Sequence, residues 1–152
     1  MRTVTTQRMP QASEAAPGRR QRRAAKLILR LLVAAALAVD AYVHADLAPL
    51  YDAIHASVSQ GDLFRVEAGV ASAGALIVLA YGRRAGFALA LLVAVSALGA
   101  ILLYRYVDVG TLGPIPNMYE PAWFPEKTTA AVAEAAATVL AAGGLLWEIR
   151  DR

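Results

Sequence analysis

The sequence contains no cysteine and only two histidines in 152 residues. The lack of cysteine excludes disulfides, thiolate metal sites, iron–sulfur clusters and cysteine nucleophiles. Two histidines also leave little room for catalytic dyads or for paired haem ligands. The chain has no Walker sequence, no glycine-rich nucleotide loop and no serine elbow. The enzyme classes that depend on these motifs are therefore excluded.

Charged residues are scarce as well, at 18% of the chain against about a quarter in an average soluble domain. Hydrophobic residues reach 58%, and they gather in four segments that are each long enough to cross a bilayer as a helix. These segments leave no room for a separate soluble domain. The sequence therefore predicts an all-α bundle with four transmembrane spans. The predicted spans cover residues 27–46, 63–81, 85–106 and 126–148, within a transmembrane domain at 26–150.

Residues 1–25 are polar and end in a basic run, and this composition predicts a disordered cytoplasmic tail. All but three of the fifteen Lys and Arg residues lie near one predicted membrane face, the exceptions being Arg65, Arg105 and Lys127. Because loops rich in Lys and Arg stay in the cytoplasm, both termini are predicted to be cytoplasmic. We expect a multi-pass protein of a bacterial plasma membrane. The positive charge is explained by topology, so no nucleic-acid partner is predicted.

Ionisable residues inside the predicted spans are the main functional signal. Asp40 and His44 lie four positions apart and share one helix face. Glu67 and Glu134 lie at a similar depth in two other spans. A carboxylate at the centre of a membrane helix costs about 2.5–3.5 kcal/mol on insertion scales, so it needs a partner or a purpose. The sequence predicts an outward-facing cluster of these four residues, with Arg105 at the end of the third span as their counter-charge.

Two interpretations of this cluster stay open. In the first, the charged side chains are interior pairs that only fix how the helices align. In the second, they bind a cation or a small amphipathic ligand. Asp40, His44, Glu67 and Glu134 are candidate ligands for a divalent metal such as Zn, Mn or Fe, or members of a proton relay. No span carries the Glu-x-x-His pair of di-iron carboxylate bundles, so the sequence does not identify a metal.

The connection between the third and fourth spans, residues 105–127, is rich in proline and aromatic residues. A loop of this length without regular structure often covers or binds a ligand. We predict that it forms a lid over the polar cluster. The alternative for its aromatic residues is simple anchoring at the membrane interface. The predicted lid residues are Asp108, Tyr119, Glu120, Trp123 and Phe124.

The segments AYVHADLAPLYD, residues 41–52, and RYVDVGTLGPIPNMYEPAWFPEK, residues 105–127, resemble a group of small, uncharacterised integral membrane proteins of actinobacteria. More loosely, four spans with polar groups gathered toward one face are similar to DoxX-like membrane proteins, some of which are linked to quinone-coupled redox processes. This second resemblance covers architecture only. It implies a four-helix fold and a quinone as a candidate cofactor, and it assigns no catalytic residue.

The leading functional hypothesis is a small membrane protein whose acid and histidine cluster binds a cation or a small amphipathic ligand. One alternative is a DoxX-like enzyme that exchanges electrons or protons with quinone. The other is a structural subunit of a larger membrane complex, which would contact its neighbours through small-residue helix faces. The expected partners are membrane lipids and either a second copy of the chain or other subunits of such a complex.

Overall fold

The computed structural model describes residues 17–151, which are helical apart from their connections. No strand forms within these residues, so the predicted all-α class is confirmed. Three helices, α2, α3 and α4, are long and apolar enough to cross a membrane. The helices are α1 (Pro17–Leu47), the short 3₁₀ helix η1 (Ala48–Tyr51), α2 (Gln60–Tyr81), α3 (Arg84–Tyr106) and α4 (Pro125–Arg150).

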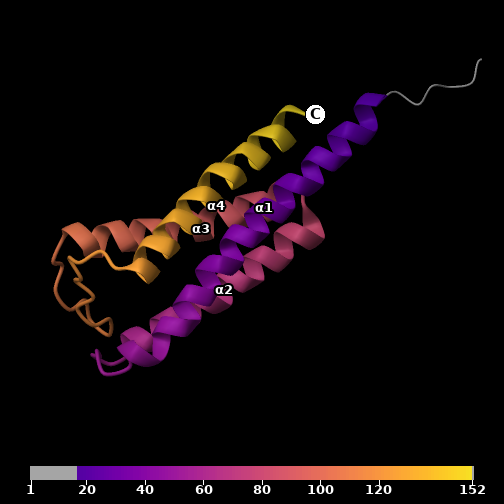
Figure 1. The fold of residues 1–152 in the computed structure, drawn as a ribbon. Helices are drawn as coiled ribbons and strands as arrows, with labels where there is room; N and C mark the ends of the chain where they lie inside the picture. The colour runs from indigo at the N-terminus through magenta and orange to yellow at the C-terminus, as the bar shows by residue number, and fades with distance from the viewer. Residues whose placement is uncertain (1–16, 152) are drawn as a thin grey trace, which may run out of the picture.

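The four α-helices form a bundle in which α1 packs against α2 and α4, while α3 packs against the same two helices from the opposite corner. Figure 1 shows α2 and α3 leaving a tight turn at one end and diverging toward the other end. That turn contains Gly82, the C-cap of α2. We call this the turn end. The opposite end, which carries the connection at 107–124, is called the loop end.

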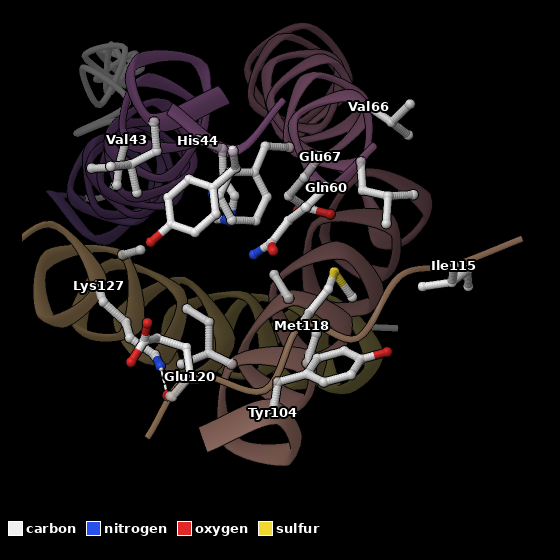
Figure 2. A pocket seen from close by; sticks show the side chains of 18 of the residues that line it. Val43, His44, Gln60, Val66, Glu67, Tyr104, Ile115, Met118, Glu120 and Lys127 are labelled. Carbon is white, nitrogen blue, oxygen red and sulfur yellow. Dashed lines mark hydrogen bonds between the residues drawn. The ribbon is translucent and has the colours of Figure 1, made fainter. Parts of the chain in front are cut away.

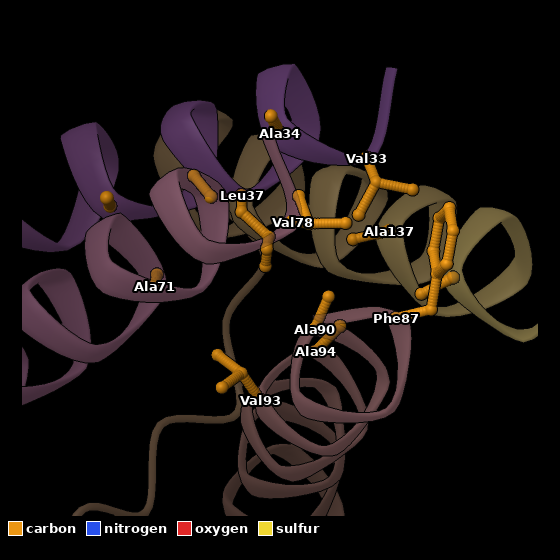
Figure 3. Close-up of a cluster of buried hydrophobic side chains, with 13 residues drawn as sticks. Val33, Ala34, Leu37, Ala71, Val78, Phe87, Ala90, Val93, Ala94 and Ala137 are labelled. Atoms are coloured by element: carbon orange, nitrogen blue, oxygen red, sulfur yellow. The ribbon is translucent and has the colours of Figure 1, made fainter. Parts of the chain in front are cut away.

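The core consists of a few large side chains set among alanines (Figure 3). Leu37 and Val78 have no exposed surface, and Phe87 has almost none. Alanines from all four helices surround them, which lets the helix backbones approach closely. A Cβ added at Gly144 of α4 would collide with the ring of Phe87, so this glycine makes room for the ring. The tightest packing therefore lies toward the turn end.

Ion pairs join the start of α1 to the end of α4. Lys26 Nζ lies 2.7 Å from Glu148 Oε1 and 2.8 Å from Asp151 Oδ2. The predicted disordered tail at 1–25 is wrong for residues 17–25, which belong to α1. Proline suits a helix start, the following Arg and Ala residues favour helix, and the ion pairs hold this turn against α4. Residues 1–16 of the predicted tail lie outside the described residues.

The other helix boundaries differ from the predicted spans by only a few residues. The start of α2 moves from the predicted residue 63 to Gln60, because Ser59 accepts a hydrogen bond from the Asp62 backbone at 2.9 Å and forms a capping box. Helix α4 begins at Pro125, where a proline is well tolerated. Polar capping residues, which hydropathy does not weigh, account for the earlier start of α2.

Candidate functional site

Three of the predicted cluster residues meet in the interior of the bundle. Asp40 and His44 of α1 face Glu134 of α4, and one ligand-type atom from each lies within 4.8 Å of the other two. Asp40 and Glu134 have no exposed surface, and His44 is 8% exposed. The Nδ1 atom of His44 lies 2.8 Å from Asp40 Oδ1 and 3.1 Å from the Asp40 backbone oxygen. The i, i+4 spacing on α1 therefore places the imidazole directly beside the carboxylate.

The two carboxylates of this cluster are poorly satisfied. Apart from the 2.8 Å contact between Asp40 Oδ1 and His44 Nδ1, none of the four side-chain oxygens of Asp40 and Glu134 has a hydrogen-bond partner within the part of the chain that the structure describes. Thr138, one turn further along α4, also has a buried hydroxyl without a partner. Buried polar groups in proteins are nearly always hydrogen-bonded, because leaving them without partners is costly. Burial of these groups therefore carries a free-energy cost that the described residues offset only in part.

A cavity of about 340 Å³ lies beside the cluster at the loop end (Figure 2). Its walls are mainly apolar and include the aromatic rings of Tyr51, Phe64 and Phe124. The ring of Phe64 packs edge-on against the His44 imidazole, with 5.1 Å between the ring centroids. The residues with polar or charged groups that line the cavity are His44, Tyr51, Gln60, Glu67, Tyr104, Glu120 and Lys127.

Glu67 of α2 connects the predicted cluster to the cavity. It lines the cavity together with His44, and Figure 2 shows the two on the same side of it. The Oε1 atom of Glu67 is buried and has no hydrogen-bond partner among the described residues. Asp40 and Glu134 do not line the cavity. The site therefore has two levels, an accessible one at Glu67 and His44 and a closed one at Asp40 and Glu134.

Arg105 does not supply the predicted counter-charge. Its guanidinium carbon lies 5.0 Å from the ring centre of Tyr106 and 5.7 Å from that of Trp123. No ion pair within 4 Å joins it to a carboxylate in residues 17–151. Arg105 stands in the last turn of α3, and there its side chain turns toward the aromatic residues at the base of the loop. Among the described residues, the carboxylates of the cluster therefore have no Lys or Arg partner, and the basic group within 4 Å of Asp40 is the His44 imidazole.

The connection at 107–124, the predicted lid, is tied to its neighbours by backbone hydrogen bonds. The Val58 N–H donates to the Pro114 carbonyl at 3.1 Å, and the Glu120 N–H donates to the Tyr104 carbonyl at 3.1 Å. These bonds tie the connection to the segment before α2 and to α3. Its inward-facing side chains are Ile115, Met118, Glu120 and Phe124.

The other predicted lid residues are placed differently. Tyr119 and Trp123 are 40% and 43% exposed, and neither lines the cavity. Asp108 accepts hydrogen bonds from the Gly110 N–H and the Asn117 side chain, at 3.1 and 2.9 Å, so it shapes the loop. Of the predicted lid residues, Glu120 and Phe124 therefore border the cavity.

Lys127 and Gln60 are cavity residues that the sequence did not single out. Lys127 is buried, donates to the Glu120 carbonyl, and lies 5.7 Å from the ring centre of Trp123. Gln60 is also buried, in the first turn of α2. A lysine in the first turn of an apolar helix was a usable signal, because such a side chain is rarely buried without a role. The sequence carried no comparable signal for Gln60.

An exposed ion pair stabilises the segment between α1 and α2. Arg65 donates to both carboxylate oxygens of Asp52, at 2.7 and 2.8 Å. These hydrogen bonds lower the pKa of Asp52 below its ordinary value. A lowered pKa stabilises the fold above the unfolded-state pKa, and this contribution is lost as the pH falls below about 4.

We therefore expect Asp52→Asn to remove a small part of the acid sensitivity of the protein. Thermal melts of the wild type and the variant at pH 6 and at pH 3 measure it. The stability difference between the two proteins should shrink at pH 3, because protonated Asp52 no longer pairs with Arg65. A difference that is the same at both pH values would show that the ion pair contributes nothing.

No family model, no curated protein and no solved structure matches this chain. The resemblances to small actinobacterial membrane proteins and to DoxX-like proteins therefore stay predictions. The function has to be argued from the site itself.

Proposed function

We propose that the protein is a four-span membrane protein that binds a small amphipathic cation in the cavity at its loop end. The observation that carries the proposal is the unpartnered, buried Oε1 atom of Glu67 on the wall of a largely apolar cavity. An apolar cavity with a few convergent polar groups is the usual form of a small-molecule site, and about 300–1,000 Å³ is its usual volume. The 340 Å³ observed here suits a small ligand.

The charges around the cavity favour a cation. Glu67 and Glu120 on the wall outnumber Lys127. A negative site repels fatty acids and other anions and attracts ammonium groups. The aromatic rings on the wall add a second attraction, because the face of an aromatic ring favours a nearby cation.

The membrane arrangement completes the proposal. Helix α1 packs alongside α2 and α4, and it exposes Leu27, Ile28 and Leu31, each about half accessible, on its outer side. Such a surface suits contact with lipid chains, so α1 is a fourth span. The distribution of Lys and Arg puts the turn end and both termini in the cytoplasm. The cavity then lies near the outer face of a plasma membrane.

Cysteine labelling tests this topology directly, because the natural chain has no cysteine. Single cysteines replace Arg20, His55 and Arg83, which are all exposed. In intact spheroplasts, a membrane-impermeant maleimide should label only His55→Cys, and the other two variants should react only after lysis. Labelling of both Arg20→Cys and His55→Cys, or of Arg83→Cys alone, would show that α1 does not cross the membrane. Labelling of both Arg20→Cys and Arg83→Cys, but not of His55→Cys, would reverse the orientation.

Three compounds of equal length test the choice of a cation: 4-phenylbutylamine, 4-phenylbutanol and 4-phenylbutyrate. The amine should bind the detergent-solubilised protein and raise its melting temperature more than the alcohol does, and the carboxylate should have no effect. Glu67→Gln should weaken amine binding about 10- to 100-fold, the loss expected for a charged hydrogen bond of about 1.5–3 kcal/mol. Isothermal titration measures the affinities.

Asp108→Asn is the matched control for this experiment. It also removes one carboxylate near the loop end, but Asp108 is exposed and does not line the cavity. Amine affinity should therefore stay within about twofold of the wild type, because surface changes of this kind have small effects. Equal affinity for all three compounds, or an unchanged affinity in Glu67→Gln, would contradict the proposal.

The quinone-linked alternative has support from Gln60 and Tyr104, which line the cavity and carry hydrogen-bond donors suited to a quinone carbonyl. A short-chain quinone in the same titration separates the two functions. Quinone binding that is tighter than amine binding and is retained in Glu67→Gln would favour the redox alternative. For the structural-subunit alternative, crosslinking in native membranes should recover a defined neighbour of the chain.

A further inference from the structure

The closed level of the site, Asp40 with Glu134, has no role in the amine proposal. Neither residue lines the cavity, so neither touches a ligand held there. Both are nevertheless fully buried, from two helices that pack against each other. All four of their carboxylate oxygens are buried, and all but Asp40 Oδ1, which lies 2.8 Å from His44 Nδ1, lack a hydrogen-bond partner in the described chain. These oxygens need a partner that the described residues do not provide.

The distances among the three residues suit ligands of one small ion. His44 Nδ1 and Asp40 Oδ1 are 2.8 Å apart, and a ligand atom of Glu134 lies within 4.8 Å of the other two. Adjacent ligands of a tetrahedral Zn²⁺ ion, each about 2.0–2.1 Å from the metal, are separated by about 3.3 Å, so the observed contact is slightly shorter and would have to open a little.

The charges lead to the same ion class. When both carboxyl groups are ionised they repel each other, and within residues 17–151 no Lys or Arg lies within 4 Å of either, the nearby basic group being the His44 imidazole. A divalent cation cancels both charges and occupies the orphaned oxygens. We propose that Asp40, His44 and Glu134 bind one divalent transition-metal ion. One imidazole nitrogen with two carboxylates suits Zn²⁺, Mn²⁺ or Fe²⁺ better than Ca²⁺ or Mg²⁺, which prefer all-oxygen sites.

His44 gives this site its route of entry. It is the one member of the three that also lines the cavity, so an ion that enters the cavity reaches His44 first. Glu67 stands on the same wall with its unpartnered oxygen and is placed to receive the ion before it passes inward. Metal binding and amine binding thus use different carboxylates. The metal uses Asp40 and Glu134, and the amine uses Glu67.

Direct metal titration tests the proposal. The purified, chelator-treated full chain is titrated with Mn²⁺ and followed by the loss of the free-ion electron paramagnetic resonance signal, and Zn²⁺ is then added as a competitor. We expect one ion per chain. Asp40→Asn and Glu134→Gln should each weaken binding by at least about 100-fold, since altering even an outer partner of a metal site costs about 10- to 100-fold. Glu126→Gln, an exposed acid in the first turn of α4, is the control and should bind as the wild type does.

A second measurement does not depend on the folding of a variant. In the wild-type protein, bound Mn²⁺ should show electron spin-echo modulation from one imidazole nitrogen. Wild-type protein that binds Mn²⁺ no more tightly than Asp40→Asn does, or bound Mn²⁺ without nitrogen modulation, would overturn the metal site and leave Asp40 and Glu134 as a pair that shares a proton. Amine titration of the same samples is read separately, so failure of the metal site leaves the amine proposal to its own test.

Discussion

Gly144→Leu is expected to destabilise the bundle by about 1–3 kcal/mol, the usual cost of overpacking a filled core. Any side chain at this position collides with the ring of Phe87, which is 1% exposed and has no free space to turn into. The ring and the helix backbone must then move apart, which separates α3 from α4. Reversible unfolding in mixed detergent micelles measures the difference in free energy.

The neighbouring glycine is the matched control. A Cβ at Gly143 meets nothing within 4 Å, and the residue lies on the exposed side of α4. Gly143→Leu should therefore leave stability unchanged or raise it by up to about 1 kcal/mol, because leucine favours helix more than glycine does. Equal destabilisation by both substitutions would show that α3 and α4 do not pack as described.

Glu134→Leu is expected to stabilise the metal-free protein by about 1–3 kcal/mol, the penalty of a buried polar group without a partner. The leucine side chain has a similar size and needs no hydrogen bond. Thermal and micelle unfolding of the chelator-treated protein measure the change. The Glu134→Leu substitution should at the same time abolish metal binding. The metal-free variant is thus expected to gain stability and to lose the proposed function.

With metal bound, the wild type should become more stable than Glu134→Leu. At a metal concentration 100 times the dissociation constant, the wild type gains about 2.7 kcal/mol while Glu134→Leu gains nothing. Glu126→Leu, at the exposed start of the same helix, should lose only about 0.3–1 kcal/mol from the helix dipole, with or without metal. If Glu134→Leu instead destabilised the metal-free protein, the buried carboxylates would be interior pairs that fix the helix alignment.

Much of the fold was predictable because apolar segments and their boundaries leave a direct record in the sequence. Pro125 marks the start of α4, and the Gly82 turn separates α2 from α3. The first turns of α1 were missed because a basic, apolar-poor run resembles a tail. Its helix depends on Lys26 reaching Glu148, a contact across the whole chain that no local pattern records.

The sequence predicted how deep in the bundle the site residues lie, but not toward which neighbours their side chains point. The i, i+4 spacing of Asp40 and His44 and the depth of Glu134 were enough to place these three together. Depth alone also suggested Arg105, whose side chain in fact turns toward Tyr106 and Trp123. The direction of a side chain around the helix axis depends on tertiary packing, and the inward-facing residues of an irregular loop follow no period at all.

Infrared difference spectroscopy tests the central claim most directly, since it reports on carboxyl groups inside the protein. The claim is that Glu67 on the cavity wall is the carboxylate that receives the cationic ligand. Adding 4-phenylbutylamine to the wild type should change a carboxyl band in the difference spectrum. The same change should appear in Asp108→Asn and should be missing in Glu67→Gln. An amine that binds without changing any carboxyl band, or that changes the same band in Glu67→Gln, would contradict the account.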